Sequence, residues 1–123
     1  MQLNARDFSD GLPLQDWLEK SIFPTEMNLT KEYAKIGALA SAVEMIKTGS
    51  TFACDMYHFP ESIVSALNEA GLRGVVCGPQ TQWPPREGGD DGSVRRELDS
   101  QLASNKAENK VNYGVATHAG YTC

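Results

Sequence analysis

The chain has 123 residues, of which 41% are hydrophobic and 22% are charged, and this composition suits one domain with its own core rather than two. Its formal net charge of -5 argues against nucleic acid or an anionic membrane surface as the main partner, because either would require a basic face. No apolar run approaches the roughly 20 residues of a membrane span, and the polar first residues lack the apolar core of a signal peptide. We therefore expect a cytoplasmic protein.

The three cysteines, Cys54, Cys77 and Cys123, are odd in number and have no C-x-x-C spacing. Neither a disulfide framework nor a zinc ribbon is indicated. Cys54 and Cys77 lie inside strand-like runs, which predicts buried and unreactive thiols at both positions.

The first expected element is a short amphipathic helix that begins at Pro13 and ends near Ile22, since proline suits the first helical position. Phe23 precedes Pro24, and a residue before proline avoids the helical region. The segment 22–26 is therefore predicted to be extended.

A long helix over residues 30–47 is predicted next, with Thr30 as its cap and Gly49 as its left-handed stop. Apolar side chains recur along it at steps of three and four residues, which predicts one face that packs on a sheet. These side chains belong to Ile36, Leu39, Ala40, Val43 and Ile46.

A strand over residues 51–57 follows the glycine and carries an acid, Asp55, near its end. The structural interpretation is that Asp55 bonds the amides of the neighbouring loop, because a buried carboxylate needs partners. The alternatives are a catalytic base and a contact between Asp55 and His58, which the spacing does not decide.

The rest of the chain alternates in the same way. The expected elements are a helix over 60–70, a strand over 74–77, a long loop over 79–92, a helix over 93–103 capped by Ser93, and a strand over 111–116. Helices alternating with strands predict an α/β fold with parallel strands. Three such strands form either a small open sheet or part of a (β/α)8 barrel, which needs ~250 residues.

Four segments of the chain, in matching order and spacing, resemble the amidohydrolase superfamily. The similar subgroup holds 5-methylthioadenosine/S-adenosylhomocysteine deaminases and triazine chlorohydrolases. The segments are Leu12-Pro13-Leu14-Gln15-Asp16-Trp17-Leu18, Ile22-Phe23-Pro24-Thr25-Glu26, Glu44-Met45-Ile46-Lys47-Thr48-Gly49-Ser50-Thr51-Phe52-Ala53-Cys54-Asp55-Met56-Tyr57 and Tyr113-Gly114-Val115-Ala116-Thr117-His118-Ala119-Gly120-Tyr121-Thr122-Cys123.

The resemblance implies a partial (β/α)8 barrel over residues 1–123, without the first-strand His-x-His pair and without the C-terminal half of the barrel. In that family a divalent metal, zinc or iron, activates water to attack a ring carbon that bears an amino group or a halide. The family's metal ligands have no counterpart in this chain. We therefore expect no metal ligand and no catalytic group here, and a chain that is inactive by itself.

Substrate-binding residues do carry over from the resemblance. Glu26 matches an acid that bonds the ribose hydroxyls, Trp17 an aromatic residue of the same pocket, and His118 a substrate contact at a strand end. Arg95 or Arg96 falls near an arginine that reaches in from a loop. Without the resemblance, Glu26 would be interpreted as solvated surface, and His118 as a structural or surface histidine.

The leading hypothesis is a fragment of an aminohydrolase that acts on a small molecule, either a nucleoside or a heteroaromatic ring. A homo-oligomer is compatible with it. The alternatives are a non-catalytic remnant that binds a partner and an autonomous α/β binding domain.

Overall fold

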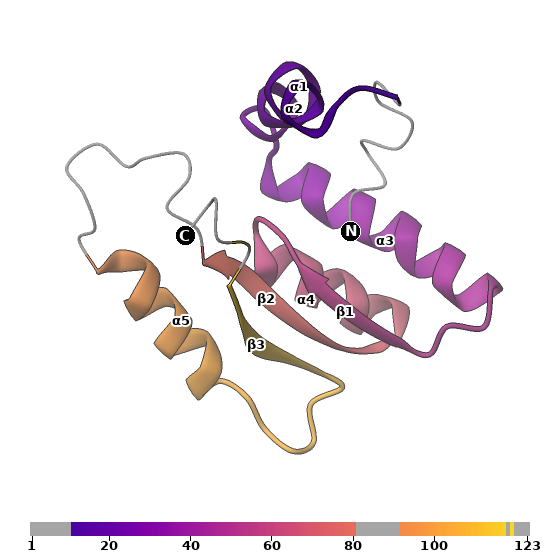
Figure 1. Cartoon of the computed structure of the whole chain (residues 1–123). Helices are drawn as coiled ribbons and strands as arrows, with labels where there is room; N and C mark the ends of the chain where they lie inside the picture. The colour runs from indigo at the N-terminus through magenta and orange to yellow at the C-terminus, as the bar shows by residue number, and fades with distance from the viewer. Residues whose placement is uncertain (1–10, 81–91, 118, 120–123) are drawn as a thin grey trace.

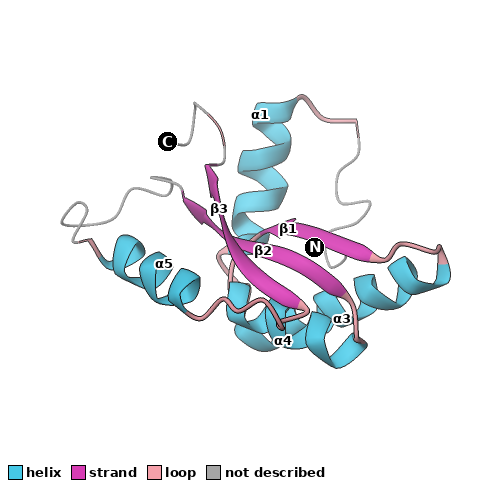
Figure 2. Cartoon of the chain, turned by 90° about the horizontal axis from the view of Figure 1, so that it is seen from below, coloured by secondary structure: helices cyan, strands magenta, loops and turns pink. Residues whose placement is uncertain are grey.

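The computed structural model describes residues 11–80, 92–117 and 119. Its three strands are parallel and form one sheet in the order β1-β2-β3 (Figure 1): β1 (Phe52–Met56), β2 (Arg73–Gln80) and β3 (Val111–Thr117). Three helices lie on one face of this sheet (Figure 2): α3 (Lys31–Lys47), α4 (Pro60–Ala70) and α5 (Ser93–Ala103). The predicted α/β architecture of three parallel strands with flanking helices is confirmed.

The register of the sheet requires glycine at one position in particular. Gly74 pairs with Ala53 of β1, and a Cβ atom at Gly74 would lie 2.7 Å from the Ala53 carbonyl oxygen. Because that oxygen belongs to the neighbouring strand's backbone, it cannot rotate away. The strands can therefore pair this closely only with glycine there.

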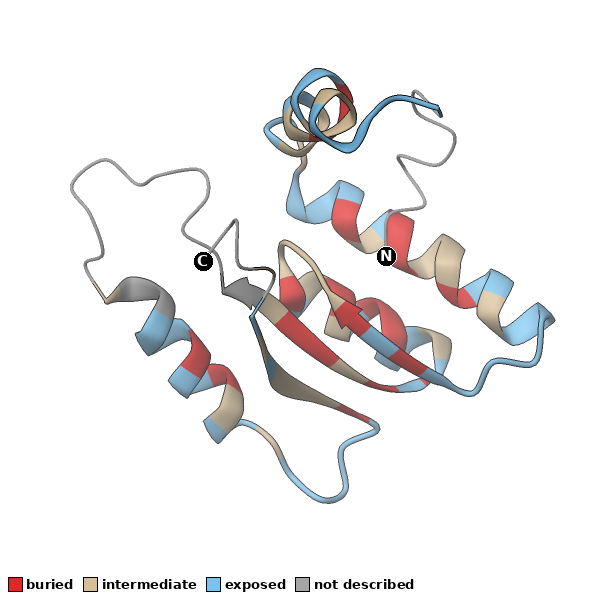
Figure 3. Cartoon of the chain, in the orientation of Figure 1, coloured by how far each residue is buried: buried red, intermediate tan, exposed pale blue. Residues whose placement is uncertain are grey.

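The core lies between the sheet and the pair α3–α4, where Figure 3 shows buried residues on the facing surfaces. Ile63, Leu67 and Val76 are the largest side chains that are almost fully enclosed. Ile63 and Leu67 are four residues apart on α4 and so share one face of the helix. This face holds α4 against the sheet.

The long helix begins and ends as predicted, but it packs with a different face. The Thr30 hydroxyl accepts a hydrogen bond from the Tyr33 amide at 3.3 Å, and Gly49 has a φ of 82°. The predicted face is wrong: Ile36, Val43 and Ile46 are exposed.

Small residues form the buried face of α3 instead. Ala34, Gly37, Ala38 and Ala42 are buried, and the helix packs chiefly on α4. Small side chains let two helix backbones approach closely, so this face gives the tighter contact although each residue buries little area. Of the predicted face, Ile36, Val43 and Ile46 remain exposed, whereas Leu39 is partly buried against the core.

Helix α4 has the predicted bounds, whereas the cap of α5 differs from the prediction. Gly92, with a φ of 73°, is the residue that precedes α5, and Ser93 is its first helical residue. The expected serine cap is therefore wrong, because the left-handed glycine reverses the chain one residue earlier.

A helical arm precedes α3 and comprises α1 (Leu14–Trp17), the π-helical turn η2 (Leu18–Ile22) and α2 (Phe23–Glu26). The predicted extended segment is wrong, since Phe23 has helical angles of −58° and −44°. Proline in a helix interior normally clashes with the carbonyl four residues earlier, and in this arm that residue, Lys20, belongs to the wider π turn rather than to an α-helix. The arm stands at the C-terminal end of β1 (Figure 1).

The cysteines of the sheet differ in environment. Cys77 is buried as predicted, but Cys54 is exposed, so the prediction of a buried thiol there is wrong. Side chains alternate along a strand, and β1 directs Ala53 and Asp55 inward, which leaves Cys54 on the other face.

Among the described residues, no helix has the length and apolar character needed to cross a membrane.

Candidate functional site

The candidate site lies where the C-terminal end of β1 meets the end of the helical arm. Parallel strands bring their carboxyl ends to the same edge of the sheet, where loops can gather polar groups. Tyr57 and His58 follow β1 directly, and Glu26 is the last residue of α2. Residues more than 30 positions apart therefore meet at this edge.

Glu26 is the centre of this group. Its side chain is only 19% exposed, and its Oε2 lies 3.7 Å from Nε2 of His58. Burial raises the pKa of Tyr57 well above its ordinary value, and the negative charge of Glu26 and a hydrogen bond between Tyr57 and Glu26 raise it further. Tyr57 therefore keeps its proton and remains a hydrogen-bond donor to the carboxylate.

Asp55 lies on β1, two residues before Tyr57, and is buried, with 9% of its surface exposed. Its charge also raises the pKa of Tyr57 and, as the smallest contribution, that of Cys77. His58 lies against Glu26, with its Nε2 atom 3.7 Å from Oε2 of the glutamate. A second acid thus adds negative potential beneath the candidate site.

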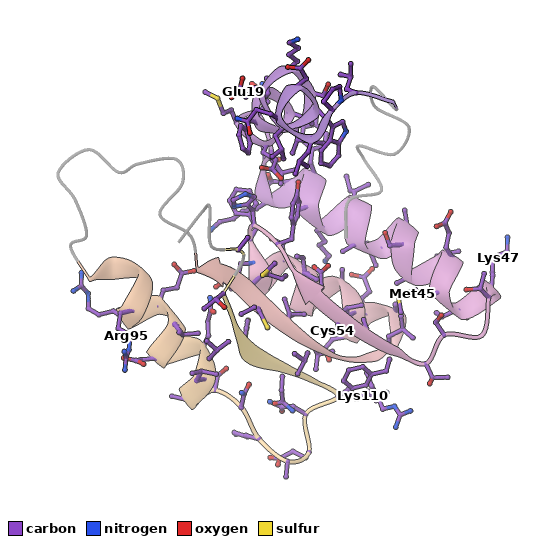
Figure 4. All side chains as sticks on the ribbon, in the orientation of Figure 1. Glu19, Met45, Lys47, Cys54, Arg95 and Lys110 are labelled. Atoms are coloured by element: carbon purple, nitrogen blue, oxygen red, sulfur yellow. The ribbon has the colours of Figure 1, made fainter. Side chains whose placement is uncertain are left out.

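Trp17 lies on α1 in the same helical arm as Glu26 and is partly buried. Arg95 and Arg96 lie on α5, apart from the arm in both views (Figures 1 and 2). Arg95 points away from the sheet (Figure 4) and binds Asp99, with Nε 3.1 Å from Oδ1. The described part of the structure thus brings Trp17 and Glu26 into one arm but leaves Arg95 on an outer surface.

His118 lies outside the described residues, directly after the end of β3. Its predicted role at a strand end stays a prediction. Tyr57 was not predicted as a site residue, although it follows the strand that carries Asp55. An aromatic hydroxyl next to a strand's carboxyl end was the available signal.

No three histidine, cysteine, aspartate or glutamate side chains come together as metal ligands among residues 11–80, 92–117 and 119. The residues that the structure describes therefore do not fit a metal centre, and we assign no metal-dependent step to them.

A separate hollow of about 420 Å³ lies at the opposite, N-terminal ends of the strands, with Arg73 and Lys110 in its lining. It contains none of the site residues.

Barrel-type α/β enzymes hold their active sites at the C-terminal edge of a parallel sheet, and here Glu26, Tyr57 and His58 gather at that edge. The sequence profile of the amidohydrolase family matches residues 1–123. The chain belongs to the amidohydrolase family.

The relatives of the chain carry the names of nucleoside deaminases. It is 37% identical to the 5-methylthioadenosine/S-adenosylhomocysteine deaminase of Thermococcus onnurineus, over 96% of the chain and 28% of that relative. It is 34% identical to the 5'-deoxyadenosine deaminase of Methanobrevibacter smithii, over 95% of the chain and 27% of that relative. The chain thus spans about a quarter of the length of these curated relatives.

The fold also matches a solved structure, an adenosine deaminase from Xanthomonas campestris with bound zinc. The TM-score is 0.80 at 26% identity, over 93% of this chain and 26% of that one. The prediction of a partial (β/α)8 barrel is therefore confirmed at the level of the fold, and the family resemblance stated from sequence is confirmed as well.

Proposed function

We propose that this chain supplies the sugar-binding side of an aminohydrolase that removes an amino group from a purine nucleoside. Its relatives are named as deaminases of 5-methylthioadenosine, S-adenosylhomocysteine and 5'-deoxyadenosine, which share a purine ring and a ribose with both of its ring hydroxyls. Glu26 would accept hydrogen bonds from the sugar hydroxyls. Trp17 would pack against the ligand, and His118 would contact it from the end of β3.

The observation that carries this proposal is the environment of Glu26. A carboxylate that is 19% exposed and lies beside a protonated tyrosine and a histidine stays oriented at the sheet edge. Ionised carboxylates form hydrogen bonds roughly twice as strong as neutral acceptors do. Such a group suits a pair of hydroxyls better than it suits an anionic or apolar ligand.

The metal and the water that it activates are assigned to residues outside the described part of this chain. The solved adenosine deaminase from Xanthomonas campestris contains bound zinc, which supports a divalent metal in the family. Arg95 and Arg96 are weaker candidates, because Arg95 already binds Asp99 on an exposed surface. The relatives' names favour an amino leaving group over the halide of a chlorohydrolase.

A chimera tests the proposal. Residues 1–123 replace the matching segment of the Thermococcus onnurineus relative, and deamination of methylthioadenosine is followed by the change in purine absorbance. Glu26→Gln should raise KM by about tenfold or more with a smaller change in kcat, since a hydrogen bond to a charged group contributes about 1.5–3 kcal/mol. Glu32→Gln, an exposed glutamate of α3, is the matched control.

Two results would contradict the proposal. One is a folded, metal-loaded chimera that does not deaminate nucleosides, which would favour the non-catalytic alternative. The other is an unchanged KM in Glu26→Gln, which would remove Glu26 from the site.

A further inference from the structure

Tyr57 is held in place by the sheet rather than by the helical arm. Its backbone amide donates a hydrogen bond to the Cys77 carbonyl at 3.3 Å, which ties the residue to β2. Its ring is partly buried and packs against the hydrophobic core. The hydroxyl therefore extends from a position fixed by the most regular part of the fold.

Glu26, in contrast, lies on a short element. Helix α2 has four residues and belongs to an arm that projects beyond the sheet (Figure 1). A glutamate has several rotatable bonds, so its carboxylate needs outside contacts to keep one orientation. Tyr57 and His58 provide such contacts from the end of β1.

The turn that carries these two residues is itself strained and well fixed. Phe59 has φ 58° and ψ 56°, and it is the only residue other than glycine with a positive φ in the described part of the chain. Bulky side chains rarely adopt this conformation, and where they do the surrounding structure enforces it. Here the Phe59 carbonyl accepts from the amides of Ser62 and Ile63, at 2.9 and 3.3 Å.

The His58 ring reinforces this arrangement. Its centroid lies 5.3 Å from that of the Tyr57 ring, with the two planes tilted by 60°, while its Nε2 faces the Glu26 carboxylate. The strained turn thus presents two neighbouring side chains to one acid. Strain of this kind is typically retained where a site needs a defined geometry.

We propose that Tyr57 is a positioning residue whose hydroxyl fixes the orientation of the Glu26 carboxylate, so that its free lone pairs face the two hydroxyls of the sugar. This inference rests on the proposed role of Glu26 in sugar binding. A carboxylate has about four acceptor sites, and Tyr57 occupies one of them. Enough sites remain for a vicinal diol, and the fixed donor selects which of them face the ligand.

Binding of two nucleosides to the 123-residue chain tests the proposal. Adenosine and 2',3'-dideoxyadenosine differ only in the diol, and NMR titration at near-neutral pH gives the affinity of each together with the response of the Glu26 side-chain carbon. The wild-type chain should prefer adenosine, and Tyr57→Phe should reduce this preference by about tenfold. Tyr33→Phe, which removes an exposed hydroxyl from α3, should retain it.

A ratio of affinities separates positioning from general structural support, because lost stability would weaken both ligands alike. The double variant Tyr57→Phe/Glu26→Gln should lose no more preference than Glu26→Gln alone, since both act on one contact. If Tyr57→Phe keeps the preference while Glu26→Gln loses it, the positioning role is overturned and sugar binding by Glu26 stands. If the wild-type chain shows no preference, sugar binding fails, and the positioning role fails with it.

Discussion

Tyr57 should make the stability of the chain sensitive to alkaline pH. Its pKa is raised in the folded state, first by burial and then by Glu26, whereas in the unfolded chain it lies near its ordinary value of about 10. Above that pH the unfolded state releases a proton that the folded state still holds, so rising pH favours unfolding. The contribution of the protonated Tyr57 to the free energy of unfolding is therefore complete below pH ~10 and is lost as the pH rises above that value.

Urea unfolding between pH 8 and pH 11 measures this effect. The free energy of unfolding of the wild-type chain should fall more steeply above pH 10 than that of Tyr57→Phe. Tyr33→Phe retains Tyr57 and should therefore keep the wild-type slope. Equal slopes for the wild-type chain and Tyr57→Phe would mean that Tyr57 titrates alike in both states.

The two described cysteines should react at different rates. Cys54 is exposed, while Cys77 is buried and has a pKa raised by that burial and then by the neighbouring Cys54. The thiolate is the reactive form, so iodoacetamide should modify Cys54 faster, by on the order of tenfold. Mass spectrometry in a Cys123→Ser background follows each site, and Cys54→Ser should leave only the slow reaction. Equal rates would show that Cys77 is accessible.

At the scale of the elements, the pairing of β1 and β2 depends on Gly74. Gly74→Ala places a Cβ atom 2.7 Å from the Ala53 carbonyl oxygen, and the two strands must separate to relieve the clash. We expect a loss of about 1–3 kcal/mol in the free energy of unfolding, measured with urea. Gly78→Ala on the same strand meets its nearest atom, a Pro60 carbon, at 3.6 Å and is the matched control. Similar losses in both variants would show that the strand does not require close pairing there.

Local signals in the sequence identified the elements well. Thr30, Gly49 and Pro60 mark boundaries through their own backbone chemistry, and the structure places helix ends at or next to each of them. The π-helical turn was not predictable in this way, because it depends on how Pro24 is accommodated within the arm. A local rule for the residue before proline gave the wrong conformation at Phe23.

Packing choices were harder to predict than boundaries. Helix α3 has an apolar face of large side chains and another of alanine and glycine, and periodicity alone does not say which one packs on α4. At the site, the family resemblance identified Glu26, but no sequence spacing connects it with Tyr57. Their contact arises from the arm and the sheet edge meeting in three dimensions.

At the scale of the whole molecule, α3 presents a stripe of exposed apolar side chains on the side that faces away from α4. Its members are more than half exposed: Tyr33, Ile36, Val43 and Ile46. Grouped apolar side chains at a surface promote association and dye binding far more than scattered ones do. The isolated chain should therefore bind the dye ANS and self-associate at high concentration.

Replacing two side chains of this stripe with lysine tests whether the stripe causes dye binding and self-association. Ile36→Lys/Val43→Lys should lower ANS fluorescence and shift sedimentation toward the monomer. The reason is that two lysines in the stripe remove the favourable free energy of burying apolar surface between two copies of the chain. Ser65→Lys/Asn68→Lys adds the same charge on exposed positions of α4 and should change neither measurement appreciably. If both double variants reduced association equally, net charge would control it rather than the apolar stripe. Stable folding of the first variant is expected, since α3 packs through its alanine face and not through the replaced residues.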